Sequence, residues 1–308
     1  MPLHPQVAEL LVRAARSALP PYHTVSAPVA RRIYRDTRAI LAPKAPELPE
    51  VRLLATENFT LRLYRPVKSE KLPALVYFHG GGWTIGDIDT HDVLCRQLAA
   101  GARCVVVSVD YRLAPEYPFP AAVDDCFAAT RYVADNAAKL NIGSIAVGGD
   151  SAGGNLAAAV SLLARDAGGP AIAFQLLIYP ATDQRLATAS HQRNAQGYLL
   201  TRDAIDYFRR AYLPDEKDWT DWRASPLLAE SHADLPPALV ITAGFDPLLD
   251  EGRAYAERLK AARGAVEYRE YADMVHGFIL FGGVLDTANT AVADCCTALR
   301  RAFEKVPA

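Results

Sequence analysis

Short apolar runs alternate with stretches of helical spacing along most of this chain, and this alternation constrains its fold more than any other feature. Residues 51–54 and 59–64 are predicted to be paired strands joined across Glu57-Asn58. Further apolar runs lie at residues 75–78, 105–109, 145–147, 174–179, 239–242 and 266–271. Helical spacing occupies the intervals at residues 91–100, 124–138, 155–166 and 250–263. Strands that alternate with helices favour an α/β fold, with a mostly parallel sheet and helices on both faces.

The composition is that of a globular chain with a large core. Of 308 residues, 51% are hydrophobic and 22% are charged, which excludes a disordered or collagen-like chain. The formal net charge is −2, so the chain lacks the basic character of proteins that bind nucleic acid or anionic lipid. We expect residues 1–308 to form a single domain, because α/β folds of this length often do.

The cysteines and the N-terminus bear on the location of the protein. Five cysteines form an odd and sparse set without CxxC spacing, which predicts reduced thiols in a cytoplasm rather than disulfides or a zinc site. Charged residues near the N-terminus interrupt any apolar segment of a signal peptide. Because no run of about 18 apolar residues occurs, we expect no membrane span and a soluble protein.

Two segments outside this alternation are predicted to form a helical cap over the carboxyl edge of the sheet. Residues 7–18 have the spacing of an amphipathic helix that packs on the body; their polar face is not basic enough to favour a membrane surface. A proline-rich connector separates them from the first strands. The interval between Tyr179 and Leu239 exceeds a normal crossover and contains a helical stretch at 201–212. We expect the cap to comprise residues 1–45 and about 183–225.

Gly149-Asp150-Ser151-Ala152-Gly153 lies between an apolar run and a helical stretch. A sharp turn from strand to helix needs small residues on both sides of a strained serine, and such a turn exposes the serine hydroxyl. The pattern therefore predicts Ser151 as a nucleophile.

A serine hydroxyl needs a base to remove its proton and a carboxylate to orient that base. His276 alone follows the last apolar run, and we predict it as the base. The other histidines after Ser151 lie in or beside the long insertion: His191 and His232. Asp246 directly follows the apolar run 238–245 and is the predicted acid, while Asp250 and Asp273 stay open as alternatives.

A glycine-rich segment, His79-Gly80-Gly81-Gly82-Trp83, follows the run at 75–78. Successive glycines let a backbone approach a substrate carbonyl and leave N–H groups unused. We predict that the N–H groups of Gly81 and Gly82 join that of Ala152 in an oxyanion hole. Trp83 is a candidate substrate-binding residue that would favour an uncharged acyl chain. His79 comes too early in the chain for the base, and we expect it to brace this loop.

Five motifs together resemble the hormone-sensitive-lipase-like family of α/β-hydrolase carboxylesterases. They are HGGGW at 79–83, DYRLAPE at 110–116, GDSAGGN at 149–155, DPL at 246–248 and HGF at 276–278. The resemblance implies an eight-stranded sheet, a helical cap, and cleavage of esters with short to medium acyl chains. Within it, Ser151, Asp246 and His276 match the family's triad. The oxyanion hole is matched by Gly81, Gly82 and Ala152.

These observations predict a serine carboxylesterase that acts by two-step acyl transfer on a small-molecule ester. The chain contains no phosphate-binding loop, dinucleotide motif or H-E-x-x-H, so no cofactor and no metal is implied. An amidase or deacetylase with the same residues is the nearest alternative. A ligand receptor on the same fold is disfavoured, because such a protein would be expected to lose a triad residue. A homodimer is left open, as are the native ester and its acyl length.

Overall fold

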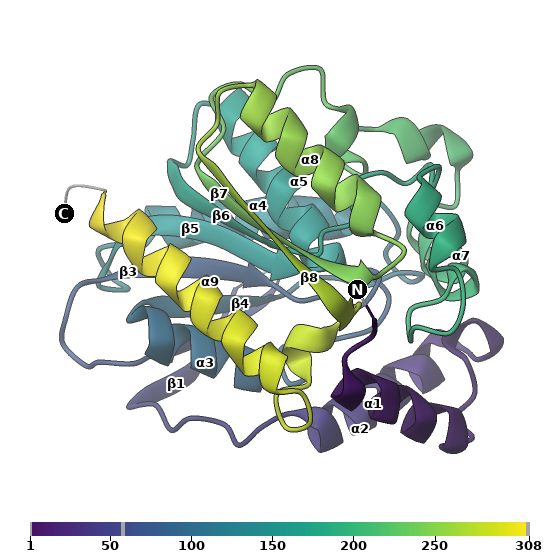
Figure 1. Cartoon of the computed structure of the whole chain (residues 1–308). Helices are drawn as coiled ribbons and strands as arrows, with labels where there is room; N and C mark the ends of the chain where they lie inside the picture. Colours follow the sequence, from purple (N-terminus) through teal and green to yellow (C-terminus); the bar gives the residue numbers. More distant parts are fainter. Residues whose placement is uncertain (1, 57–58, 306–308) are drawn as a thin grey trace.

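A computed structural model describes residues 2–56 and 59–305, and its centre is a twisted sheet (Figure 1). The eight strands lie in the order β1-β2-β4-β3-β5-β6-β7-β8. β2 pairs antiparallel with β1 and β4, and the other neighbouring strands are parallel, which confirms the predicted α/β-hydrolase sheet. The predicted turn Glu57-Asn58 lies outside the described residues. The strands are β1 Glu50–Ala55, β2 Thr60–Arg65, β3 Leu72–Phe78, β4 Val105–Asp110, β5 Ile142–Asp150, β6 Ile172–Ile178, β7 Ala238–Phe245 and β8 Val266–Val275.

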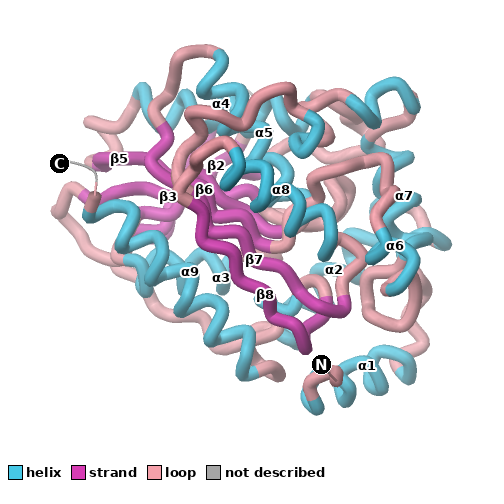
Figure 2. The backbone as a smooth tube through the Cα atoms, turned by 45° about the horizontal axis from the view of Figure 1, so that its top comes forward, coloured by secondary structure: helices cyan, strands magenta, loops and turns pink. Residues whose placement is uncertain are grey.

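Helices cover both faces of the sheet (Figure 2). In β3, Val76 and Phe78 pack into one hydrophobic cluster, whereas Leu75 and Tyr77 pack into the other, because side chains alternate along a strand. Both faces are apolar, so each needs a helical layer. On one face lie α4 Ala121–Asp135, α5 Ala152–Asp166 and α8 Leu249–Ala261. On the other face lie α3 Asp92–Ala102 and α9 Asp286–Glu304. In the described residues, no helix is both long and apolar enough to span a bilayer.

The two segments expected to form a cap meet beyond the carboxyl ends of the parallel strands (Figure 1). The N-terminal segment contains α1 Pro5–Arg16, the short helix at Tyr22–Thr24 and α2 Ala27–Leu41. The insertion contains α6 Ala189–Arg193 and α7 Arg202–Tyr212. The ring of Tyr22 lies 6.0 Å, centroid to centroid, from that of Phe208 on α7. A small hydrophobic cluster joins α2 to α7 and to the loop after β3: Ala30, Tyr34, Ile85, Ala204 and Phe208.

Candidate active site

Ser151 lies at the sharp turn between β5 and α5. Its backbone has φ 56° and ψ −116°, which residues with a side chain rarely adopt. The turn packs against the end of β3, where the carbonyl oxygen of Phe78 is very close. A Cβ atom on Gly149 would lie 2.3 Å from this oxygen, and one on Gly153 only 1.9 Å. This approach excludes any side chain at either position, which explains the glycines around Ser151.

The structure brings Ser151, His276 and Asp246 into one line of hydrogen bonds. Nε2 of His276 lies 2.8 Å from Oγ of Ser151, and Nδ1 of His276 lies 2.6 Å from Oδ2 of Asp246. His276 directly follows β8 and Asp246 directly follows β7, so adjacent parallel strands place the two side chains together. Asp246 is fully buried, and its Oδ1 accepts a hydrogen bond from the N–H of Leu248.

The two alternative aspartates make other contacts. Oδ2 of Asp250 accepts a hydrogen bond from the N–H of Ser190 at 2.8 Å, and its Oδ1 lies 3.4 Å from Nη2 of Arg193. Asp273 precedes the end of β8, and its backbone carbonyl accepts a hydrogen bond from the N–H of His4. Of the three candidates, Asp246 is the one that contacts His276 in the described chain.

The glycines of the loop after β3 have conformations and neighbours that exclude a side chain. Gly81 has φ +123° and Gly82 has φ +56°, and a Cβ atom on Gly81 would lie 2.1 Å from the carbonyl oxygen of Ile85. The N–H groups of Gly81, Gly82 and Ala152 have no hydrogen-bond partner within the described chain. Ala152 is the first residue of α5, where N–H groups lack intrahelical partners. All three residues line the same cavity as Ser151.

Asp150 connects this glycine loop to the turn at Ser151. Its Oδ1 accepts hydrogen bonds from the N–H of Gly80 at 3.0 Å and from the hydroxyl of Tyr77 at 2.7 Å. Its Oδ2 lies 3.3 Å from Nε2 of His91. Burial opposes ionisation of Asp150, but His91 and the hydrogen bond from Tyr77 outweigh it and lower the pKa of Asp150 to about 2. Asp150 is therefore an ionised acceptor that holds the start of the loop.

His79 contacts the glycine loop and Tyr111. Its Nδ1 lies 2.9 Å from the carbonyl oxygen of Gly80, and its ring stacks on Tyr111 at 4.2 Å between centroids. The hydroxyl of Tyr111 donates to the carbonyl oxygen of His79 at 2.7 Å. Burial, together with the neighbouring His91, lowers the pKa of His79 to about 4, so its ring is neutral near pH 7.

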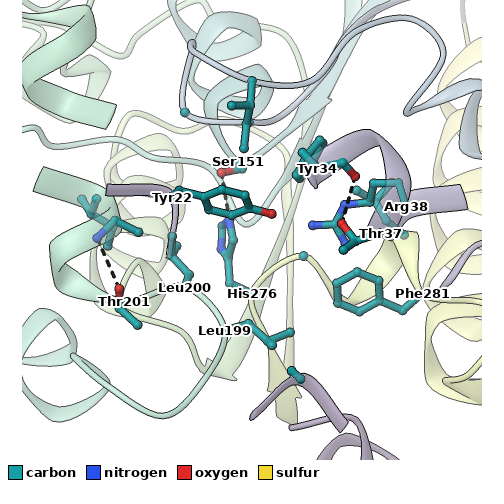
Figure 3. A pocket seen from close by; sticks show the side chains of 18 of the residues that line it. Tyr22, Tyr34, Thr37, Arg38, Ser151, Leu199, Leu200, Thr201, His276 and Phe281 are labelled. Atoms are coloured by element: carbon teal, nitrogen blue, oxygen red, sulfur yellow. Dashed lines mark hydrogen bonds between the residues drawn. The ribbon is translucent and has the colours of Figure 1, made fainter. Parts of the chain in front are cut away.

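A cavity of about 1120 Å³ opens in front of Ser151 and is lined by both the N-terminal segment and the insertion. Figure 3 shows Ser151 and His276 with Leu199, Leu200 and Tyr22 around them. Trp83 belongs to the cavity wall but is only 4% exposed, and its ring stacks on Tyr212 at 4.6 Å. Substrate contact by Trp83 stays a prediction.

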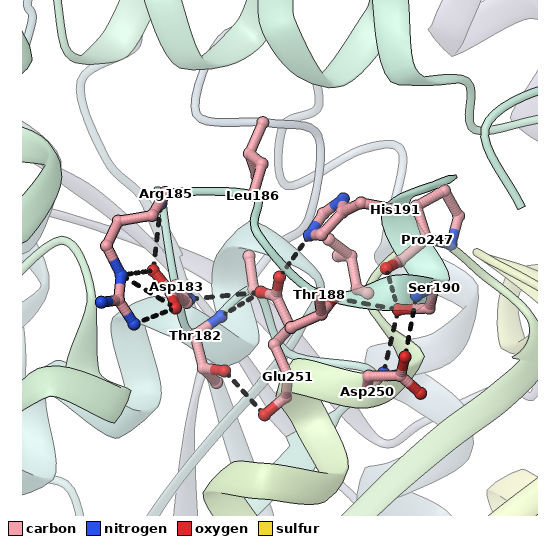
Figure 4. A network of polar contacts seen from close by, with 12 residues as sticks. Thr182, Asp183, Arg185, Leu186, Thr188, Ser190, His191, Pro247, Asp250 and Glu251 are labelled. Atoms are coloured by element: carbon pink, nitrogen blue, oxygen red, sulfur yellow. Dashed lines mark hydrogen bonds and ion pairs between the residues drawn. The ribbon is translucent and has the colours of Figure 1, made fainter. Parts of the chain in front are cut away.

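A buried Glu251 ties the insertion to α8 (Figure 4). Its Oε1 accepts hydrogen bonds from the N–H groups of Thr182, at 2.6 Å, and Asp183, at 3.2 Å. Its Oε2 lies 2.6 Å from Nε2 of His191. Burial raises the pKa of Glu251, although His191 and the backbone donors oppose this effect. His191 thus contacts Glu251, and His232 contacts the carbonyl oxygen of Pro226, whereas His276 contacts Ser151.

Several residues of the site were not predicted from the sequence. The ring of Tyr179 lies 4.7 Å from that of His276, and Tyr22, Tyr34 and Arg38 line the cavity. Tyr179 ends an apolar run and has φ 33°, a strain that no local pattern reveals. The other three lie on the N-terminal segment, more than 100 residues before Ser151. Within the described residues, no group of three or more His, Cys, Asp or Glu side chains is arranged to hold a metal ion.

Comparison with known proteins places this geometry in a family. The model of an alpha/beta hydrolase fold family matches residues 75–280, which include the glycine loop, Ser151, Asp246 and His276. The chain is 47% identical to the carboxylesterase NlhH of Mycobacterium tuberculosis over 270 residues, covering 83% of this chain and 84% of that protein. The chain belongs to the hormone-sensitive-lipase-like family of α/β-hydrolases.

Members of this family also match the chain over nearly its whole length. An ethyl acetate hydrolase of Pseudomonas putida is 37% identical over 318 residues, covering 98% of this chain and 99% of that protein. An ester hydrolase from the metagenome of Lake Arreo, solved with a derivative of bipyridine phosphonate, has a TM-score of 0.95 and 43% identity. That match covers 98% of this chain and 100% of the solved chain. The likeness therefore includes the N-terminal segment and the insertion.

Proposed function

We propose that this protein is a serine carboxylesterase that hydrolyses carboxylic esters with short to medium acyl chains. The observation that carries the proposal is the hydrogen-bonded line from Ser151 through His276 to Asp246 at the wall of the cavity. The activities named for similar proteins, a carboxylesterase and an ethyl acetate hydrolase, support it.

In the proposed mechanism, Oγ of Ser151 attacks the ester carbonyl while Nε2 of His276 takes the hydroxyl proton. Asp246 keeps Nδ1 of His276 protonated and stabilises the imidazolium. The N–H groups of Gly81, Gly82 and Ala152 donate to the oxyanion of the tetrahedral intermediate. His276 then gives its proton to the leaving alcohol, which leaves an acyl-serine.

Water completes the cycle by the reverse sequence. His276 takes a proton from water as the hydroxide attacks the acyl-serine, and a second tetrahedral intermediate forms in the same oxyanion hole. Its collapse breaks the bond to Oγ, and His276 returns the proton to Ser151. The carboxylic acid is released and the enzyme is regenerated without a cofactor.

We further propose that residues 1–45 and 183–225 act as one cap within a single domain of 308 residues. The cavity lining supports this proposal, because it combines Tyr22 and Tyr34 with Leu200 and Phe208. Trp83 and the apolar cap side chains would hold the uncharged acyl chain.

The location and assembly of the protein are separate proposals. All five cysteines are buried and free, which suits a reducing cytoplasm. The small-molecule ester is the proposed partner. A homodimer stays a prediction, and the mass of the protein in solution tests it.

The decisive experiment compares p-nitrophenyl esters of increasing acyl length with a matched butyryl anilide, in the wild type and in Ser151→Ala. We expect the highest kcat/KM for a short or medium ester, a lower value for the anilide, and a loss of at least about 10⁴-fold in the variant. The control is Ser161→Ala inside α5, where Oγ donates to the carbonyl of Ala157, away from the cavity lining. A folded Ser151→Ala that keeps about a tenth of the wild-type rate would contradict the assignment.

A further inference from the structure

Arg38 is a charged residue of the cavity wall whose side chain has no ionic partner in the described chain. Two other arginines on α2 differ from Arg38 because they form ion pairs. Arg31 forms an ion pair with Glu116, and Arg35 forms one with Asp87. Arg38 lies one to two turns further along the helix and lines the cavity instead. No described carboxylate lies within ion-pair distance of it.

The guanidinium of Arg38 is held by aromatic rings and by the neighbouring hydroxyl of Tyr34, not by a carboxylate. Its Cζ atom lies 4.3 Å from the ring centroid of Tyr34 and 4.5 Å from that of Phe281. Rings contact the face of a guanidinium, whereas its N–H groups point outward in its plane. Nε is buried and without a hydrogen-bond partner. The hydroxyl of Tyr34 is a hydrogen-bonding neighbour of this cation and is itself neutral, because burial raises the pKa of Tyr34 to about 12. The stacking therefore fixes the orientation of the donors without using all of them.

This cation stands close to the reacting groups. Nη2 of Arg38 lies 3.9 Å from the position that a Cβ atom on Gly277 would take, and Gly277 directly follows His276. Figure 3 shows Arg38 beside Thr37 and Phe281, on one side of Ser151 and His276. The hydroxyl-bearing residues Tyr22 and Thr37 line the same cavity. A substrate bound at Ser151 can therefore extend to a polar corner with a fixed positive charge.

The negative groups in the cavity wall do not neutralise this charge, because each has a partner of its own. The lining carboxylates and their partners are Glu9 with Arg13, Asp150 with His91, Asp183 with Arg185, and Glu251 with His191. A cation in a largely apolar cavity loses hydration, and an anionic ligand would compensate that loss. The wall thus has a positive charge for which the protein itself provides no counter-ion.

We propose that Arg38 binds a carboxylate carried by the substrate, so that the enzyme prefers esters with a free acid group, such as half-esters of dicarboxylic acids or acyloxy acids. This inference rests on the proposed esterase function and names its substrate class. A guanidinium fork matches the two oxygens of a planar carboxylate, and the low dielectric of the cavity strengthens the pair. The carboxylate belongs to whichever part of the ester, acyl or alcohol, extends from Ser151 to Arg38.

The test uses substrate pairs in which a carboxylate is replaced by a carboxamide of the same shape. The acyl-side pair is monoethyl glutarate and ethyl 4-carbamoylbutanoate, and the alcohol-side pair is 3-acetoxypropanoate and 3-acetoxypropanamide. The readout is the ratio of kcat/KM for the acid to that for the amide, at about pH 7 where the acids are ionised. It is measured for the wild type, Arg38→Gln, Arg38→Lys and the control Arg32→Gln. Arg32 is exposed on the same helix and does not line the cavity.

In at least one pair, we expect the wild type and Arg32→Gln to favour the acid and Arg38→Gln to lower the ratio by about 10- to 100-fold. Arg38→Lys should retain part of the preference, because it keeps the charge but loses the fork. Discrimination by the wild type against the acid in both pairs, or a preference that survives in Arg38→Gln, would overturn the proposal. Arg38→Met replaces Arg38→Gln if the latter does not fold. If neither the acids nor the neutral amide esters are hydrolysed, the proposed esterase function is wrong, which is a different outcome from failure of the Arg38 proposal.

Discussion

Phe208 of α7 packs directly on Gly82 of the glycine loop: a Cβ atom built on Gly82 would lie 2.3 Å from Cγ of Phe208. The insertion is therefore in contact with the backbone that is proposed to bind the oxyanion. A shift of α7 would change the room available to that loop. The proposed cap and the proposed oxyanion hole are thus in direct contact through one ring and one glycine.

Gly82→Ala should lower kcat/KM for p-nitrophenyl butyrate by about 100-fold or more, because the new methyl group displaces either Phe208 or a proposed oxyanion donor. Steady-state kinetics measures this effect. The control is Gly143→Ala in β5, where a Cβ atom would meet nothing closer than 3.8 Å and where activity should stay near that of the wild type. A Gly82→Ala enzyme with wild-type kinetics would show that the loop does not supply a donor.

Asp246→Asn should lower kcat by about 10⁴-fold at neutral pH while the fold is retained. An asparagine amide would donate to Nδ1 of His276, so that Nε2 carries the proton and cannot accept one from Ser151. Asp250→Asn is the matched control, because Asp250 is bound to Ser190 and Arg193 instead. If Asp250→Asn were the more damaging change, the acid would have been misassigned.

The free energy of unfolding should decrease as the pH is lowered, in two separate pH ranges. The pKa of buried His79 is lowered from 6.5 to about 4, so the unfolded state binds more protons and stability decreases as pH falls from about 6.5 to 4. The pKa of Asp150 is lowered from 3.8 to about 2, so its contribution is present above about pH 4 and is lost between about pH 4 and 2. Urea unfolding at a series of pH values measures both effects.

Asp150→Asn should lower the free energy of unfolding at neutral pH by roughly 2 kcal/mol and flatten the profile in the lower of these pH ranges. Asp36→Asn, at an exposed position of α2, serves as the control and should leave the pH profile unchanged. A pH profile in Asp150→Asn that matches the wild type below pH 4 would mean that the carboxylate is not held ionised by its neighbours.

The sheet could be predicted because its strands are short, apolar and separated by helical spacing. Each predicted run lies within or overlaps a strand, although β5 begins at Ile142 and β8 extends to Val275, where polar residues hide the strand ends. By contrast, α2 and α9 were not singled out. α2 nevertheless carries apolar residues at helical spacing, Ala30, Ile33, Tyr34 and Leu41, so its sequence contains a helix signal that the prediction did not use.

The groups around Ser151 were accessible to sequence analysis because local chemistry fixes them. The serine is recognised because it lies between glycines after a strand. The aspartate and the histidine are recognised because each directly follows a later strand, in the order serine, acid, histidine. The cavity wall has no such signature. Arg38 and Phe281 become neighbours only when distant segments pack together, and neither has a periodic or spaced motif.

One side-chain amide joins the two ends of the insertion. Nδ2 of Asn155, in the first turn of α5, donates to the carbonyl oxygens of Ala181 and Ala224, each at 2.8 Å. The insertion therefore begins and ends at a shared anchor, one helical turn from Ser151. Because both ends are tied at this point, the residues between them can diverge in length and sequence without moving the serine, which allows new specificities to evolve on an unchanged reaction centre.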